Sequence, residues 1–227
     1  MVNYEVAFKR PFSDLKKLLI AVLLNILPIV NFVVYGYFLE IARSSGKKDA
    51  ALPEWKDFGK LFLNGFFALV IGLLYLLPVI AVMAILFAST HISMLSYMHG
   101  GPSFESFAPA FSGLGVWLLL ILVLLIALAY ILPLAVLSFA LTGEFSSAFE
   151  LGRIVKKTLT SEYFVVWLVS IVYSAVLGGL LGLVPWVGKA AAGAVTGITM
   201  FTLLGEIYPT LGSATETKTK GSKKVKN

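Results

Sequence analysis

The 227-residue chain has no cysteine and few charged residues. Without cysteine there can be no disulfide framework, no thiolate metal site and no cysteine nucleophile. Charged residues make up 13% of the sequence, about half of the roughly 25% that is usual in soluble domains. Lysine, arginine, aspartate and glutamate are absent from three long stretches, residues 61–104, 106–143 and 163–188. This lack of charge excludes an ordinary soluble domain.

The charge-free stretches are apolar on all sides, and apolar residues make up 59% of the chain. A helix needs roughly 20 apolar residues to cross a bilayer, so each stretch can hold at least one crossing helix. We expect an all-α, polytopic membrane bundle with four full spans, at residues 61–90, 113–141, 163–184 and 188–208. The last two form an antiparallel hairpin around Val184–Gly188. Four short aromatic-faced segments ahead of the apolar blocks predict amphipathic helices at the membrane interface. They are Tyr4–Phe12, a segment from Pro53 onward that carries Trp55, Phe58 and Phe62, then Phe104–Phe111, and Phe145–Phe149.

The first apolar block, Leu18–Ile41, has two interpretations because Pro28 and Asn31 interrupt its middle. The block either spans the membrane as one kinked helix, or turns back as two half-length helices in a re-entrant segment. The run from Leu27 to Asn31 resembles the hairpin turn at Val184–Gly188, which favours turning back. Re-entry also predicts that this segment is buried inside the bundle, because non-helical backbone cannot face lipid.

The positions of the basic residues favour the re-entrant interpretation. If the first block turns back, all but Lys189 of the 18 basic residues lie on one side of the membrane. If it spans, Lys9, Arg10, Lys16 and Lys17 move to the other side. Basic residues concentrate on the cytoplasmic side of membrane proteins. We therefore expect a multi-pass protein of the cell membrane with both termini in the cytoplasm.

The domain organisation follows from composition. Residues 1–211 are expected to form a single α-helical membrane domain. Residues 212–227 are rich in serine, threonine and lysine, a composition typical of a disordered segment, here a cytoplasmic tail.

Two spans carry a similar tyrosine–proline pattern, with Tyr75 ahead of Pro78 and Tyr130 ahead of Pro133. Each proline lacks a backbone N–H and so leaves a carbonyl one turn earlier without its helical partner. Packing kinks are the simpler interpretation of this pattern. The alternative is a pair of hinges or a broken-helix site, such as transporters use. Together with Pro28 and Asn31, these four residues are the candidate structural or pore positions.

Small residues mark the expected site of close helix packing. Gly178 and Gly182 are four residues apart, as are Gly193 and Gly197. This spacing lets helix backbones approach closely in a membrane. We expect these glycines to pack the last two spans together.

Reactive groups are scarce, so no catalytic residue, cofactor site or metal site is assigned. There is no phosphate-binding loop with the sequence G-x-x-x-x-G-K-[ST] or G-x-G-x-x-G. His91, His99 and Glu105 lie on one loop, but their spacing is not one that is typical of metal ligands. Coupled transporters place ionisable residues within their spans, and here the only candidate is Glu40, which can pair with Arg43 instead.

The sequence therefore favours a non-catalytic membrane protein, a scaffold or a subunit that binds partner helices. A small uncoupled permease or channel for a neutral solute is the alternative, and a lipid-modifying enzyme is a third and weaker hypothesis. The expected partners are the lipid bilayer and either helices of other membrane proteins or further copies of this chain. No nucleic-acid partner is expected, because the basic residues are placed as orientation signals.

One segment resembles a known family. The run from Leu52 to Phe62 reads L-P-E-W-x-D-F-G-x-L-F, Gly65 follows it, and Gly36-Tyr37 and Arg43 lie upstream. This pattern is similar to that of an uncharacterised, chiefly archaeal family of polytopic membrane proteins, classified as a domain of unknown function. The resemblance covers Phe8 to about Tyr208. It implies a prokaryotic cell-membrane location, and it implies no activity, substrate or site residues.

Overall fold

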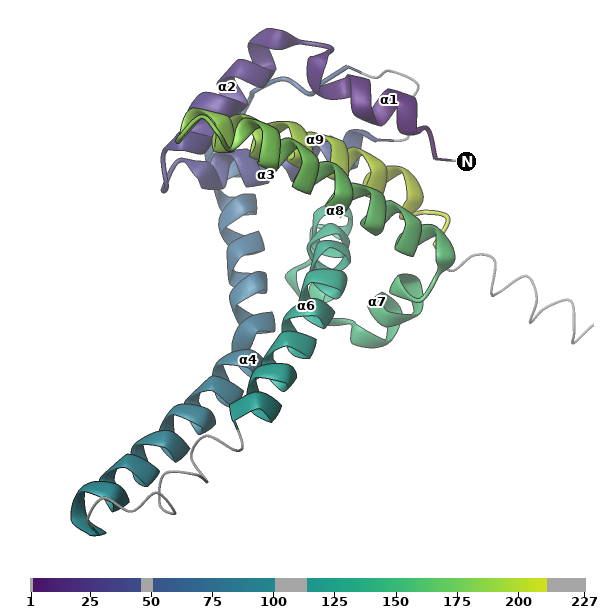
Figure 1. Cartoon of the computed structure of the whole chain (residues 1–227). Coiled ribbons are helices and arrows are strands. Elements are labelled where there is room, and N and C mark those ends of the chain that lie inside the picture. The colour runs from purple at the N-terminus through teal and green to yellow at the C-terminus, as the bar shows by residue number, and fades with distance from the viewer. Residues whose placement is uncertain (1, 46–50, 101–113, 212–227) are drawn as a thin grey trace, which may run out of the picture. The chain divides into compact units, whose positions relative to one another are not determined.

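The computed structural model describes residues 2–45, 51–100 and 114–211, and these residues form helices and no strand. The predicted all-α fold is confirmed. The tail predicted from residue 212 onward lies outside the described residues. The helices are α1 (Tyr4–Lys9), the 3₁₀ helix η1 (Arg10–Phe12), α2 (Leu15–Ile26), α3 (Asn31–Ser44), α4 (Phe58–Gly100), α6 (Leu114–Thr142), the 3₁₀ helix η2 (Phe145–Phe149), α7 (Leu151–Thr158), α8 (Ser161–Leu181) and α9 (Val187–Ile207) (Figure 1).

Four helices of the described residues are long and apolar enough to cross a membrane. They are Phe58–Ser89 within α4, Gly115–Thr142 within α6, and the whole of α8 and α9. These are the four spans expected from the sequence, so the chain is a multi-pass membrane protein.

The helices divide between two compact units, and each is considered by itself. The first unit contains residues up to Ile71 and from Pro133 onward, and the second contains Gly72–Leu132. Helices α4 and α6 each contribute to both units. Within the second unit, α4 and α6 are in contact at the unit's first and last residues: a Cβ added at Gly72 would lie 3.9 Å from Cδ2 of Leu132.

Helices α2 and α3 form a hairpin rather than one kinked helix. Leu27 precedes Pro28 and has an extended backbone, with φ −93° and ψ 117°, because a following proline disfavours the helical conformation. The backbone N–H of Asn31 then donates to the carbonyl of Leu27 at 2.8 Å and starts α3. The chain turns back, because Nη1 of Arg10, just before α2, lies 2.8 Å from Oγ of Ser45, just after α3. The turn back is the geometry of the re-entrant interpretation. The expected burial of the segment is wrong at the turn itself, because Leu27 is 51% and Ile29 is 72% exposed, and it holds only for α3.

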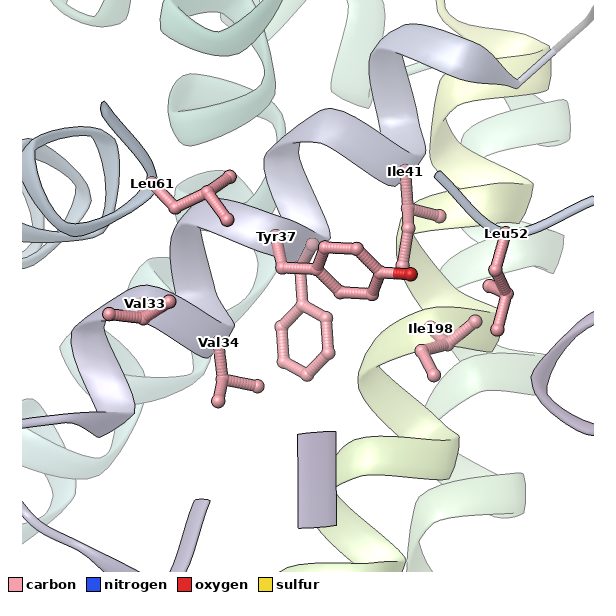
Figure 2. Close-up of a cluster of buried hydrophobic side chains, with 8 residues drawn as sticks. Val33, Val34, Tyr37, Ile41, Leu52, Leu61 and Ile198 are labelled. Atoms are coloured by element: carbon pink, nitrogen blue, oxygen red, sulfur yellow. The ribbon is translucent and has the colours of Figure 1, made fainter. Parts of the chain in front are cut away.

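The core of the first unit surrounds α9. Helix α9 packs against α8, α3, α2 and α1. Of its 18 most apolar consecutive residues, 61% are buried, against 11% for the corresponding stretch of α8. A cluster of buried side chains joins α3, α9, the start of α4 and the segment before α4 (Figure 2). Its members, here called the core cluster, are Val33, Val34, Tyr37, Phe38, Ile41, Leu52, Leu61 and Ile198.

The segment before α4 differs from the sequence prediction. A short amphipathic helix was expected from Pro53 onward, but residues 51–57 are not helical and α4 begins at Phe58. Asp57 has a positive φ of 58°, which no continuous helix can contain. The segment is held by tertiary contacts instead, since Tyr37 donates its hydroxyl to the carbonyl of Pro53 at 2.8 Å. These contacts outweigh the local helical pattern.

The other expected interfacial helices are short. Tyr4 and Phe8 lie on α1, Phe12 ends η1, and Phe145 and Phe149 bound the 3₁₀ helix η2. The third expected segment, Phe104–Phe111, lies outside the described residues.

Candidate functional site

The most strongly buried charge of the described residues is Arg10, which η1 places against the ends of α3 and α9. Its side chain is 2% exposed. Nη1 donates to Oγ of Ser45 at 2.8 Å and to Oγ1 of Thr202 at 3.3 Å, and Nη2 donates to Oγ of Ser44 at 2.7 Å. Further bonds reach the carbonyls of Ile41 and Ala51. We call Arg10, Ser44, Ser45 and Thr202 the Arg10 cluster.

The Arg10 guanidinium has only neutral acceptors among these partners. Burial lowers the pKa of Arg10, and the nearby Tyr37 and Glu206 partly offset this effect. Its Nε atom is buried and has no hydrogen-bond partner among the residues that the structure describes. A buried cation is costly unless it is well bonded. The five bonds tie three separate chain segments to this side chain: the end of α3, helix α9 and the segment before α4.

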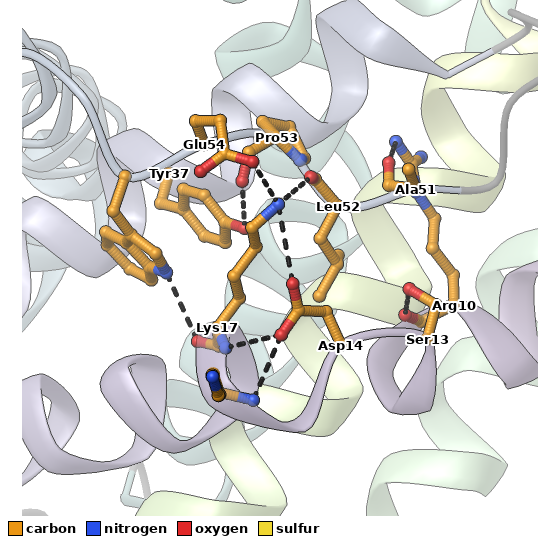
Figure 3. Close-up of polar contacts among 11 residues, drawn as sticks. Arg10, Ser13, Asp14, Lys17, Tyr37, Ala51, Leu52, Pro53 and Glu54 are labelled. Carbon is orange, nitrogen blue, oxygen red and sulfur yellow. Dashed lines mark hydrogen bonds and ion pairs between the residues drawn. The ribbon is translucent and has the colours of Figure 1, made fainter.

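A second polar group lies beside the Arg10 cluster and joins α2 to the segment before α4 (Figure 3). Nζ of Lys17 lies 2.6 Å from Oε1 of Glu54 and 3.5 Å from Oδ2 of Asp14, and it donates to the carbonyl of Leu52 at 2.9 Å. The hydrogen bond with Glu54 raises the pKa of Lys17. The Lys17 backbone N–H, which donates to Asp14, lowers the pKa of that carboxyl.

Aromatic stacking adds to this polar group, and the two together form a junction between α2, α3 and the segment before α4. The rings of Tyr37 and Trp55 are stacked with centroids 3.7 Å apart, and Nε1 of Trp55 donates to the carbonyl of Lys17 at 3.2 Å. Tyr37 thus connects the core cluster to the segment before α4, and Trp55 connects that segment to α2. The junction can hold the open end of the α2–α3 hairpin shut.

Helices α3 and α4 cross with their backbones in contact. A Cβ added at Gly36 would overlap the carbonyl oxygen of Leu61, and one added at Gly65 would overlap the carbonyl oxygen of Phe32. Only glycine has no side chain to interfere at such a crossing. At the end of α3, Arg43 instead joins α3 to α6, because its Nε donates to the carbonyl of Ala140 at 2.5 Å. Nη1 of Arg43 also pairs with Glu40, as the sequence predicted.

Buried amides near the hairpin turn are of two kinds. Nδ2 of Asn25 donates to the carbonyl of Ala190 at 3.0 Å and so joins α2 to α9. By contrast, Oδ1 of Asn31 and Nδ2 of Asn64 are buried without a hydrogen-bond partner among the described residues. Asn31 was a candidate position in the sequence, and Asn64 was not among the candidates.

The threonines of α9 bond to their own helix. Thr196, Thr199 and Thr202 donate to the carbonyls four residues earlier at 2.7 to 2.9 Å. Thr199 and Thr202 are each only 1% exposed. This row of hydroxyls is therefore engaged in the helix interior.

The four predicted packing glycines have different surroundings. A Cβ added at Gly193 would lie 2.9 Å from Nδ2 of Asn25, and one added at Gly197 would overlap the ring of Phe38. Both glycines of α9 therefore allow close approach by the α2–α3 hairpin. A Cβ added at Gly178 would meet nothing within 4 Å, and Gly182 follows the end of α8. The close approach by small residues thus involves α2 and α3, not the face of α8 that carries Gly178.

The tyrosine–proline pairs lie within continuous helices. Pro78 is inside α4 and Pro133 is inside α6. Tyr75, Pro78 and Tyr130 belong to the second unit, and Pro133 begins the part of α6 in the first unit. Pro28, in contrast, lies in the turn between α2 and α3. Of the three candidate prolines, Pro28 alone lies between helices, and it does so at the hairpin turn.

The weak metal candidate cannot be assembled from the described side chains. The expected loop is wrong at His91, which lies within α4, and its ring is tilted against that of Phe87 with centroids 4.3 Å apart. The side chain of His99 and all of Glu105 lie outside the described residues. Within the described part of the chain, no group of three or more metal-ligating side chains is found.

Comparison with known proteins places the chain in a family. The model of the family described as "Protein of unknown function (DUF4013)" matches residues 19–186, well over half of the chain. The chain belongs to this family. No curated protein and no solved structure matches it. The match includes the residues that carried the sequence resemblance, from Gly36 to Gly65.

The structure gives physical reasons for the residues that carried the sequence resemblance. Gly36 and Gly65 permit the α3–α4 crossing, and Tyr37 and Trp55 form the stacked junction. These residues therefore hold α3, α4 and the segment before α4 together. Sequence reasoning missed Arg10 altogether, treating it only as an orientation charge. Its one available signal is its position directly before Pro11, within an aromatic amphipathic segment.

Proposed function

We propose that this DUF4013 protein is a non-catalytic membrane scaffold or partner-binding subunit. The observation that carries the proposal is the use of polar side chains in the first unit. Arg10, Asn25 and Arg43 bond one helix or segment to another, and Thr199 and Thr202 bond back to their own helix. Polar groups used in this way hold a frame together and are not left available to a substrate.

The proposed location is the cell membrane of a prokaryote, as the resemblance to a chiefly archaeal family implies, with both termini cytoplasmic. The α2–α3 hairpin is proposed to enter from the cytoplasmic side and return. Helix α2 has 12 residues, about 18 Å of helix, which is too short for a hydrocarbon core of about 30 Å. Its exposed residues Leu15, Leu19 and Leu23 suit contact with lipid.

The partner surface proposed is the exposed face of α8. Leu168, Ile171, Val172 and Val176 are exposed there, and Gly178 meets no neighbour. A helix from a partner can approach closely over such a small residue. The partner is proposed to be a membrane helix, from a second copy of this chain or from another protein.

Photocrosslinking in native membranes tests this surface. A photoreactive residue at Val172 is expected to give a discrete adduct of higher mass, because the side chain faces outward. The same residue at Ala194, which is fully buried, is the matched control and should give none. Val172 adducts with lipid alone would contradict the proposal.

A small uncoupled permease or channel for a neutral solute is the second candidate function. The unpartnered amide atoms of Asn31 and Asn64 favour it, because a polar solute could satisfy them. Uptake of a neutral solute into liposomes should then occur with the native chain and disappear in Asn31→Leu. No uptake from a panel of small neutral solutes would remove this candidate.

A further inference from the structure

The two unpartnered amide atoms of the first unit have opposite hydrogen-bonding character. Oδ1 of Asn31 can only accept a hydrogen bond and Nδ2 of Asn64 can only donate one. Both are buried without a partner among the described residues. Leaving a buried polar group unpaired costs about 1–3 kcal/mol. Two such atoms in the first unit need a physical explanation.

The two amides lie on the same flank of the α3–α4 crossing. Gly36 lies against Leu61, and Gly65 lies against Phe32, so the residue order is reversed and the helices run antiparallel. Asn31 and Asn64 each come one residue before a contact residue. Around the axis of its own helix, each asparagine is therefore rotated by about 100° from that contact residue, and both rotations have the same sense. In an antiparallel pair, equal rotations bring both side chains to one flank.

The opposite flank supports this assignment. Val33 and Phe62 each come one residue after a contact residue, and both belong to or pack on the core cluster. They are rotated in the other sense and share the apolar flank. The contact pairs also fix the positions along the helix axes: Asn31 on α3 and Asn64 on α4 are offset by two residues, which is a helix rise of about 3 Å. One small group can therefore reach both amides.

We propose that Asn31 and Asn64 form a hydroxyl-binding site on this flank of the crossing. A hydroxyl group accepts a hydrogen bond from Nδ2 of Asn64 and donates its proton to Oδ1 of Asn31. It is the smallest neutral group that does both. The ligand class is a water molecule or a small neutral alcohol or polyol. Because the amide torsion of asparagine is broad, rotation of the two amides admits the hydroxyl. The site does not depend on the scaffold role or on transport.

Solid-state NMR on proteoliposomes tests the site without a transport assay. In protein labelled with ¹⁵N at asparagine, magnetisation is transferred from water protons to Nδ2 of Asn64, in glycerol-free buffer. A second sample contains ¹³C-glycerol, and the dephasing of the Asn64 Nδ2 signal by glycerol carbons is measured. The expected result is a hydroxyl contact at Asn64 in at least one sample. Water transfer alone identifies water as the ligand, and glycerol dephasing identifies a polyol.

The variants assign the contact to both amides. Asn31→Leu should abolish the signal at Asn64, and Asn31→Asp, which keeps an acceptor oxygen in place, should retain it. Asn25 is the internal control, because its Nδ2 donates to Ala190 and should show no hydroxyl contact in any sample. An unshifted Asn25 signal also shows that each variant is folded.

Two results would overturn the proposal. One is the absence of any hydroxyl contact at Asn64 in both samples of the native chain. The other is a direct hydrogen-bond coupling between Nδ2 of Asn64 and the side-chain carbonyl of Asn31, which would make the pair a clamp between helices.

Discussion

The chain contains two helical hairpins of similar design, α2–α3 and α8–α9. Each turns at a proline, Pro28 or Pro185, and each has one buried helix and one exposed helix. They differ in length, with 12 and 14 residues in α2 and α3 and 21 in each of α8 and α9. At 1.5 Å per residue, only the longer hairpin matches a bilayer.

The two hairpins also differ in what closes their open ends. The α2–α3 hairpin ends in the Arg10 cluster and the stacked Tyr37–Trp55 junction. The open end of the α8–α9 hairpin also has polar contacts, but they lie nearer the surface: Oγ1 of Thr210 donates to Oε2 of Glu162 at 3.2 Å, and Nζ of Lys157 donates to the carbonyl of Tyr208 at 3.0 Å. The comparison teaches that a hairpin too short to span can still be fixed in place, by close backbone crossings and by polar groups at its base.

The largest expected effect is at the backbone crossing. Gly36→Ala should lower the free energy of unfolding by about 3 kcal/mol, because the new Cβ overlaps the Leu61 carbonyl and overpacks the crossing. Thermal unfolding in detergent measures it. Gly178→Ala on α8 is the matched control, since it meets open space, and it should be neutral or stabilising by up to about 1 kcal/mol. Equal effects at both glycines would break the comparison.

The second effect is at the base of the short hairpin. Arg10→Met keeps the volume but removes the donors to Ser44, Ser45 and Thr202. The free energy of unfolding should fall by about 2 kcal/mol. Lys9→Met, next to it and exposed, should change it by less than about 0.5 kcal/mol. If the two variants are equally stable, the Arg10 cluster does not hold the hairpin.

How far the sequence predicts the fold depends on the range of the forces involved. Span positions and the turn at Pro28 follow from apolar length, charge placement and proline geometry, which are local properties. The irregular segment around Trp55 could not be predicted, because Tyr37 and Lys17 hold it from distant positions. Arg10 escaped notice for the same reason, since its partners lie more than 30 residues away.

The candidate site shows the same division. The α9 glycines were identified as close-packing positions, but their partners on α2 and α3 depend on how the hairpins meet. Asn31 was singled out by its place in the turn. Its pairing with Asn64 depends on the direction in which α3 and α4 cross, and no local pattern carries that information.

The smallest expected effect is a difference in pH dependence between the caps of the two hairpins. Asp14 caps α2, and its pKa in the folded protein is lowered. Its stabilising contribution is therefore complete above the unfolded pKa of about 3.9 and is lost as the pH falls through the folded pKa. The difference in melting temperature between the native chain and Asp14→Asn should shrink towards pH 3.

The cap of α8 provides the control for this titration. Thr160 accepts from the backbone N–H of Tyr163 through its hydroxyl, which does not ionise. The difference caused by Thr160→Ala should stay constant over the same pH range. A pH-dependent difference at Thr160, or a constant one at Asp14, would contradict the assignment of charge to the α2 cap.

The central claim is that the α2–α3 hairpin returns to the side of the membrane from which it enters. The absence of native cysteine allows single cysteines at Lys9, Lys60 and Lys189 to be labelled with a membrane-impermeant reagent. The account predicts that positions 9 and 60 are labelled from the same side and position 189 from the other. Labelling of positions 9 and 60 from opposite sides would contradict it.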